Sequence, residues 1–210
     1  MGVRRSGGVY TARPRTVLTI LAAVIVAGFG GGDGTEQVFG AADAARIAAV
    51  RPVGPGWVWP RIPEQGDALS GEPDSSDPLL TALKEQTAHL VQLGEAGNTW
   101  RNEDKLGKLS VSVFGSADDA HEMMAPFNAF SRTAGERSGA VTKDERLDYL
   151  GDEAWRLRVG GSGTQVTYHW RRGNLVVEAH VHCFGLCPID VDAGTRAWAD
   201  AIDAEATHRS

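Results

Sequence analysis

The chain of 210 residues has few cysteines, less basic than acidic charge, and no apolar run of the length that spans a membrane. Its 27 Asp and Glu outnumber its 21 Lys and Arg, which gives a formal net charge of −6 at pH 7. Four of the arginines lie before residue 17, so the rest of the chain is more acidic still. Acidic proteins are poor candidates for binding nucleic acid or anionic membrane surfaces. We therefore predict no nucleic-acid partner, and membrane contact only through the N-terminal segment.

The signatures of common catalytic sites are also missing. The Gly-rich stretches lack the lysine and the strand-to-helix context of a phosphate-binding loop. Ser162 is not in a nucleophile elbow, because Thr164 stands where the second glycine should be. The acid pairs Glu103-Asp104, Asp118-Asp119 and Asp152-Glu153 have structural explanations, as a loop, a helix cap and a strand start. We predict that the protein is not an enzyme and uses no cofactor, with an exported hydrolase as the third choice of function.

The N-terminal segment, residues 1–35, has the pattern of an export signal. Four arginines between residues 4 and 15 precede an uncharged apolar run at 17–29. A secretory signal has about 7–15 apolar residues after a basic segment, whereas a spanning helix needs about 20. Val26-Ala27-Gly28 resembles the residues before a lipidated cysteine, but Phe29 follows and has no sulfur. The segment is predicted to be a signal peptide or a membrane anchor, with the rest extracytoplasmic, either secreted or held at the cytoplasmic membrane.

Residues 36–77 are rich in proline, glycine and acidic residues and are predicted to be a linker. The alanine-rich part, residues 40–50, fits either a short helix or a tether. Trp57 and Trp59 stand out, since exposed tryptophan is uncommon in a linker. They are expected to dock on the folded domain as a lid, and the alternative is an aromatic platform for a ligand.

Residues 78–206 are predicted to fold as one domain. Asp77-Pro78 should start a helix that ends at Gly94, and residues 109–114 alternate as a strand. Ser116 should cap a second helix, which Pro126 is expected to kink or end. Residues 135–148 are expected to be a loop, with a weak strand at 146–149. Asp190 should cap a final helix whose apolar stripe contains Val191, Thr195, Trp198 and Ile202.

The stretch 154–187 holds three alternating runs separated by Gly-rich turns, which predicts a three-stranded antiparallel meander. We expect the apolar sets to meet, because a one-residue slip moves every side chain to the other face. This pairs Val159 with Thr164, Leu157 with Val166 and Trp155 with Tyr168 in the first hairpin. In the second hairpin it pairs Trp170 with Leu175, Tyr168 with Val177 and Val166 with Ala179. The prediction is an α+β fold, with the meander and at least one earlier strand forming an antiparallel sheet covered by helices on one face.

The opposite face of the meander is expected to be wet and basic. Its candidate ligand face contains Arg156, Arg158, His169, Arg171, His180 and His182. Such a face could receive an anionic ligand or an acidic partner segment, and the histidines would make binding depend on pH. The alternative is an ordinary solvated face that Glu178 partly neutralises.

Four side chains that can bind a metal lie within eight residues: His180, His182, Cys183 and Cys187. Imidazole and thiolate ligands suit zinc or copper. Strand alternation, however, directs Cys183 away from the two histidines, and two cysteines in an exported protein are more often bonded to each other. We predict a Cys183–Cys187 disulfide with Cα atoms about 4.4–6.8 Å apart. A metal site is the alternative.

Two segments resemble a known group of proteins: Gly151-Asp152-Glu153-Ala154-Trp155, and Arg172-Gly173-Asn174-Leu175-Val176-Val177. With the Ala-rich final helix, they resemble small secreted or lipid-anchored actinobacterial domains, including the extracellular sensor domains of membrane-bound Ser/Thr kinases. The resemblance covers roughly residues 78–205. It implies an antiparallel sheet with packed helices, and no catalytic residue carries over. Any sensing would need a separate partner, because the chain has no kinase domain.

We therefore predict a non-catalytic extracytoplasmic domain of the cell envelope that binds a ligand or partner and is sensor-like. Its partner would be an unknown protein or small ligand in the envelope. A metal-binding envelope protein is the second choice.

Overall fold

The computed structural model describes residues 38–53, 77–101, 104–161, 163–185 and 190–208. All of them belong to one unit, Glu36–Ser210. Trp57 and Trp59 lie outside the described residues, so the predictions about them stay untested. In chain order the elements are α1 (Ala41–Ala48), α2 (Pro78–Thr87), β1 (Gln92–Arg101), β2 (Lys105–Phe114), α3 (Ala117–Ser138), β3 (Ala140–Leu147), β4 (Glu153–Gly160), β5 (Gly163–Arg172), β6 (Leu175–Phe184) and α4 (Val191–Thr207).

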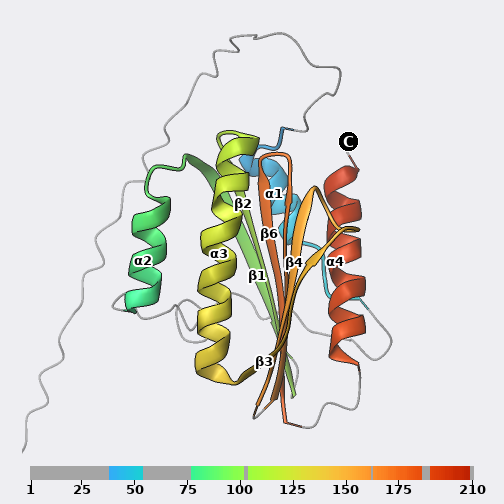
Figure 1. Cartoon of the computed structure of the whole chain (residues 1–210). Coiled ribbons are helices and arrows are strands. Elements are labelled where there is room, and N and C mark those ends of the chain that lie inside the picture. The colour runs from blue at the N-terminus through green and yellow to red at the C-terminus, as the bar shows by residue number, and fades with distance from the viewer. Residues whose placement is uncertain (1–37, 54–76, 102–103, 162, 186–189, 209–210) are drawn as a thin grey trace, which may run out of the picture. The chain divides into compact units, whose positions relative to one another are not determined.

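The six strands form one antiparallel sheet in the order β1-β2-β6-β5-β4-β3. The meander is therefore present, and the earlier strand at 109–114 joins it through the pairing of β2 with β6. Helices α1 and α4 pack on one face of the sheet, and α3 packs on the other (Figure 1). We call these faces the α4 side and the α3 side. The α+β prediction is confirmed, but helices cover both faces rather than one.

Three side chains start helices at the positions that the sequence predicts. Asp77 Oδ1 accepts from the backbone N–H of Leu79 at 2.9 Å, and Ser116 Oγ accepts from that of Asp119 at 3.0 Å. Asp190 caps α4 in the same way. Each carboxylate or hydroxyl oxygen satisfies a backbone donor that has no partner inside the helix. These signals are local, which is why they could be recognised without the fold.

The predicted end of α2 at Gly94 is wrong. The helix stops at Thr87, and residues 92–101 form β1 instead. Gly94 is the position where β1 runs close beneath α1, since a Cβ added there would lie 2.8 Å from Ala41 Cβ. The glycine thus serves a close approach between two elements rather than a helix end.

Two further expectations are corrected in the region of α3. The helix continues through Pro126, because Ala120 and Met124 before it and Gly135 after it are all buried. That packing holds both halves of the helix in line despite the lost backbone hydrogen bond. The expected loop at 135–148 contains the end of α3 and then β3, an edge strand whose residues are exposed or half-buried. Its polar sequence reflects this edge position.

The register of the first hairpin differs from the prediction by one residue. Leu157 lies opposite Thr167, and Trp155 lies opposite His169. Trp155 and Leu157 therefore face the α3 side, whereas Val166 and Tyr168 face the α4 side. The expectation of one dry face and one wet face is wrong. Both faces carry apolar side chains, so matching the apolar sets of two neighbouring strands could not identify the register.

The second hairpin is shifted by two residues, which preserves the predicted faces. Its loop is Gly173-Asn174, with Gly173 at φ +53°, and Trp170 lies opposite Val177. Tyr168 is paired with Ala179 rather than with Val177. Since side chains repeat every two residues along a strand, the apolar sets of β5 and β6 still meet on the helix-covered α4 side.

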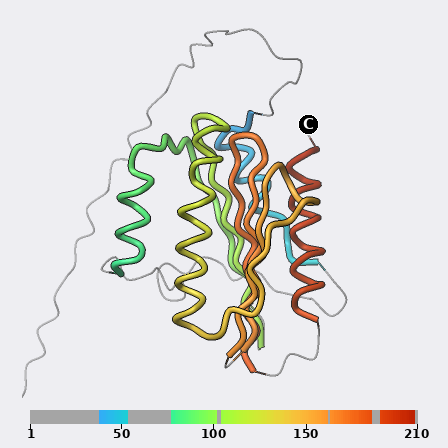
Figure 2. The backbone as a smooth tube through the Cα atoms, viewed as in Figure 1, coloured from blue at the N-terminus to red at the C-terminus, as the bar shows by residue number. Residues whose placement is uncertain are grey.

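The main core lies on the α4 side. Trp100, Trp170 and Trp198 are almost fully buried, and the rings of Trp100 and Trp198 meet edge to face at 5.4 Å. The predicted stripe of α4 is buried, including Thr195 and Ile202. A smaller apolar group surrounds Phe114 and Met124 beneath the first turns of α3. The backbone trace shows α3 and α4 on opposite sides of the strands (Figure 2).

Part of the predicted linker belongs to this core. Phe39, Ala44 and Ile47 are buried with the residues of the sheet, so the folded domain begins well before residue 78. The buried amide of Asn174 holds this segment: it accepts from Phe39 N at 2.7 Å and donates to Phe39 O at 3.0 Å and Phe114 O at 2.7 Å. Residues 54–76 lie outside the described ranges.

Candidate functional site

The predicted ligand face is divided between the two sides of the sheet. Arg156 and Arg158 lie on the α4 side, opposite Tyr168 and Val166. The other four residues lie on the α3 side: His169, Arg171, His180 and His182. The cause is the one-residue shift of the first hairpin, because it places each side chain of β4 on the opposite face, relative to β5, from the one predicted.

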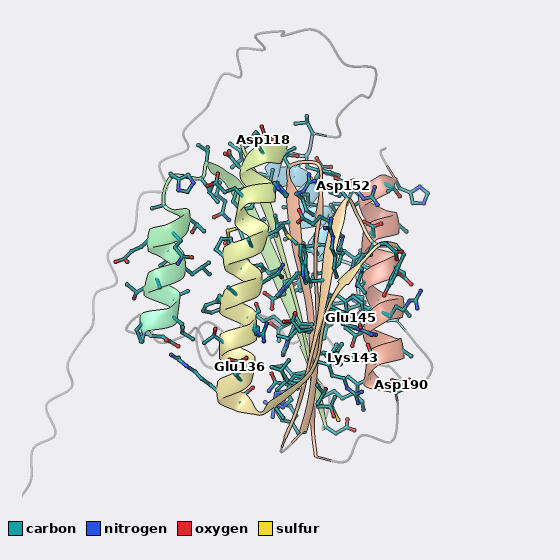
Figure 3. The ribbon with its side chains drawn as sticks, in the orientation of Figure 1. Asp118, Glu136, Lys143, Glu145, Asp152 and Asp190 are labelled. Carbon is teal, nitrogen blue, oxygen red and sulfur yellow. The ribbon has the colours of Figure 1, made fainter. Side chains whose placement is uncertain are left out.

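Arg156 connects the sheet to α4. Its side chain is 14% exposed, and its guanidinium contacts Glu145 of β3, which Figure 3 labels, and lies 3.1 Å from Asp192 in the first turn of α4. Tyr168 donates its hydroxyl to the same Asp192 at 3.1 Å. Burial, together with the charge of Asp192, raises the pKa of Tyr168 well above its usual value. Because its guanidinium joins β3 to the first turn of α4 through Glu145 and Asp192, Arg156 has a structural role.

Arg171 is also engaged within the protein. It donates to Gly173 O at 3.1 Å and lies 3.6 Å from both Asp152 and Glu153. Asp152, at the upper end of the sheet in Figure 3, in turn accepts from the backbone N–H of Gly173 at 2.7 Å. These contacts fix the turn between β5 and β6 and remove Arg171 from the candidate ligand face.

His169 lies beneath α3 and is only 2% exposed. Its Nδ1 is 3.0 Å from Asn128 Oδ1, while its Nε2 is 3.5 Å from Ser131 Oγ and 3.7 Å from the carboxylate of Glu178. Both ring nitrogens of His169 are therefore engaged, Nδ1 by the side chain of Asn128 and Nε2 by those of Ser131 and Glu178. The ring of Phe127 packs 4.5 Å away.

The three contacting side chains resemble a catalytic triad, with Ser131 in the place of the nucleophile, His169 in that of the base and Asn128 in that of the orienting amide. The geometry nevertheless favours a structural role. The imidazole is enclosed between α3 and the sheet, and Ser131 lies in the helix interior, where its neighbouring backbone N–H groups are used by the helix. The hydrolase hypothesis therefore gains no exposed nucleophile from this group.

Glu178 and His180 stand next to this group on β6. Burial opposes ionisation of Glu178, but His169, His180 and Lys108 outweigh it and lower the pKa of Glu178 to about 2. Burial lowers the pKa of His180 to about 4, against the opposing effect of Glu178. At neutral pH the carboxylate is ionised and His180 is neutral, with Nδ1 2.8 Å from Thr167 Oγ1.

Farther along the strands, the α3 side is not covered by α3. Within the described residues, α3 does not pack on β1, and α2 packs on α3 rather than on the sheet. Toward the β1 edge, the α3 side carries four basic side chains, which we call the basic strip: Arg101, Lys108, His180 and His182. Lys108 is paired with His180 across β2 and β6, and Leu106 stands between Arg101 and His182.

The two permanent cations of the basic strip are exposed. Neither Arg101 nor Lys108 forms a salt bridge with any described residue. Arg101 instead lies 6.0 Å from the centre of the Phe184 ring, which also packs against His182 at 4.3 Å. Burial lowers the pKa of His182. The strip can therefore present cations and imidazole nitrogens to an anion.

The alternative metal site does not come together among the described residues. His180 and His182 project to the α3 side, whereas Cys183 is buried on the α4 side. Groups of three or more His, Cys, Asp or Glu suited to a metal are absent from the described part of the chain. Gly185 has the expected positive φ of +83°. Cys187 lies outside the described residues, so both the disulfide and the four-ligand site stay predictions.

Sequence reasoning missed Arg101, Lys108, Asn128 and Ser131 as members of these groups. Lys108 could have been found, because it directly precedes the alternating strand 109–114 and continues the polar half of its alternation, Ser110 and Ser112. Asn128 and Ser131 gave no such signal, since Pro126 obscured the helix that places them over His169. No family model matches the chain, and no curated protein matches it either. The resemblance to actinobacterial envelope domains stays a prediction.

Proposed function

We propose that the protein is a non-catalytic, sensor-like domain of the cell envelope that binds an anionic ligand or an acidic partner segment. The binding surface is the basic strip. The observation that carries this proposal is the placement of Arg101 and Lys108, exposed and without a salt bridge to the described residues, beside two histidines. Such cations recognise a carboxylate or phosphate through charge-assisted hydrogen bonds.

The electrostatics of β6 support this proposal. Lys108, His169 and His180 hold the pKa of Glu178 at about 2 despite its burial. At neutral pH, where His180 is neutral, Lys108 is the permanent cation of this group and stabilises negative charge at this part of the sheet. Glu178 lies toward His169, whereas Lys108 and Arg101 extend toward the exposed end of the strip, where a second anion could be stabilised in the same way. In an acidic chain, a local basic surface of this kind favours a specific site over general anion binding.

The extracytoplasmic location rests on the N-terminal pattern of arginines followed by the apolar run at 17–29. None of the helices in the described ranges is long and apolar enough to cross a membrane. A domain held outside the cytoplasm by such a segment would bind its ligand or partner in the envelope.

Titration with an oligo-glutamate peptide and, separately, with inorganic phosphate tests the proposal. Chemical shifts of the backbone amides of β1, β2 and β6 report binding at the strip. Lys108→Glu should weaken binding by about tenfold to a hundredfold, since one lost charge-assisted contact is worth about 1.5–3 kcal/mol. Lys143→Glu is the matched control, because Lys143 is an exposed lysine on β3, at the opposite edge of the sheet (Figure 3). Equal losses in both variants, or no shift changes with either probe, would contradict the proposal.

A further inference from the structure

The two edges of the sheet differ in how they are protected. β3, one edge, carries four consecutive charged residues, 143–146, and a bulge between Val141 and Lys143. Charged side chains and bulges are common devices that stop an edge strand from pairing with another chain. β1, the other edge, has only Glu95 and Arg101 as charged residues over ten positions, and it pairs with β2 alone among the described strands.

The surroundings of β1 leave room for another strand. On the α4 side, α1 runs along β1, with Ala41 above Gly94 and the backbone oxygen of Ala48 bonded to Asn98. Arg46 of α1 points toward α4, where it bonds Glu205, so helical geometry turns Ala41 and Ala45 toward the edge. Both alanines are exposed, and their methyl groups do not block the approach of a strand. On the α3 side, neither α2 nor α3 packs on β1.

From this edge we infer that β1 pairs antiparallel with β1 of a second copy of the chain, around a two-fold axis at Asn98. Directly opposite residues of an antiparallel pair lie on the same face. A two-fold axis at Asn98 places Glu95 of each copy opposite Arg101 of the other. Both residues are exposed and lie on the α3 side, so the pairing forms two cross-strand ion pairs.

The charges select this register over its neighbours. Only every second residue of β1 directs its backbone N–H and C=O groups away from β2, and these residues must lie opposite the same kind of residue in the other copy. The two-fold axis can therefore move along β1 only in steps of whole residues. An axis at Gly97 would place Arg101 opposite Leu93 and Glu95 opposite Thr99. An axis at Ala96 would place Glu95 opposite Gly97. Of these three registers, only the one centred on Asn98 pairs both charges.

The dimer joins the two sheets into one continuous sheet, with both α3 helices on the same side. It shares Arg101 with the proposed ligand site, whereas Lys108, His180 and His182 lie on strands that the pairing does not use, so Lys108→Glu tests ligand binding without touching the dimer contacts.

The test measures the mass of the full-length chain in a mild detergent, by light scattering after gel filtration, over a range of concentrations. Wild type should be a dimer. Glu95→Arg and Arg101→Glu each place like charges opposite each other twice, and each should raise the dissociation constant by about tenfold or more. The two single variants mixed together should form a one-to-one dimer, because each mismatch is then corrected. The double variant E95R/R101E should also recover the dimer.

Circular dichroism of the single variants shows whether each is folded. Recovery of the dimer in the mixture is a second proof that both variants are folded. Lys143→Glu on β3 and Lys108→Glu on β2 are the matched controls and should stay dimeric. A wild-type chain that is monomeric throughout would overturn the inference, and would mean that β1 is covered by another part of the chain or serves a different protein. Single variants as dimeric as wild type would also overturn it.

Discussion

The two sides of the sheet are built from the same six strands, yet they differ in chemistry. The α4 side is filled by apolar side chains, including three almost fully buried tryptophans. The α3 side has a small apolar group under the start of α3, then the His169–Glu178–His180 group, and then the basic strip. One side therefore provides most of the hydrophobic stabilisation, whereas the other exposes charged and titratable groups.

This difference separates stability from binding. Substitutions on the α4 side should lower the free energy of unfolding, while those of Arg101 and Lys108, the exposed cations of the basic strip, should change binding and leave stability nearly unaffected. The following three changes examine that separation, beginning with the largest expected effect.

Trp198→Ala should cost about 3–5 kcal/mol of unfolding free energy, because the side chain is fully buried against Trp100 and the cavity cannot fill completely. Urea denaturation followed by circular dichroism measures the loss. Trp155→Ala is the matched control on the α3 side, where the ring is half-buried and lies against Arg146. Its cost should be clearly smaller, and equal costs would remove the distinction between the two sides.

Asn174→Ala should cost about 2–3 kcal/mol, since it leaves the backbone groups of Phe39 and Phe114 buried without their partner. The loss should be concentrated in α1, whose amide hydrogens should exchange faster than those of α4. Asn98→Ala removes one half-buried hydrogen bond to Ala48 O and should cost only about 1 kcal/mol. Uniform acceleration of exchange over all helices would show that Asn174 does not specifically hold the N-terminal segment.

Acidification should weaken the fold through the α3 side. The pKa of His180 falls from 6.5 to about 4 on folding, so the unfolded chain binds this proton more readily. The stability contribution is present above pH 6.5 and is lost as the pH falls toward 4, by about 3 kcal/mol at most. The pKa of Glu178 falls from 4.5 to about 2 on folding, so this carboxylate adds a further loss of stability as the pH falls from 4.5 to about 2.

His180→Gln should flatten the dependence of unfolding free energy on pH between 6.5 and 4, because the titrating group is removed. The exposed His208 at the end of α4 supplies the control, and His208→Gln should leave the slope unchanged. Denaturation curves at several pH values give both slopes. An unchanged slope in His180→Gln would show that other groups cause the acid sensitivity.

Local signals in the sequence determined much of the fold. The caps at Asp77, Ser116 and Asp190 depend on a side chain and the backbone two or three residues away, so they are readable without the rest of the chain. The alternating runs of β4, β5 and β6 and the stripe of α4 likewise follow from a single period within each element. These features gave the α+β class, the meander and the buried set of the last helix.

Tertiary structure decided what depends on two elements together. The register between β4 and β5 could not be read, because helices cover both faces and either face accepts apolar side chains. β1 and β3 are edge strands whose polar or glycine-containing sequences resemble loops, and only pairing with β2 and β4 makes them strands. The same physics placed α1 in the core and kept α3 continuous at Pro126, since contacts with distant strands outweighed local preference. The basic strip is a further consequence, because only the pairing of β1, β2 and β6 brings its four side chains to one face of the sheet, and α3 does not pack on β1 among the described residues.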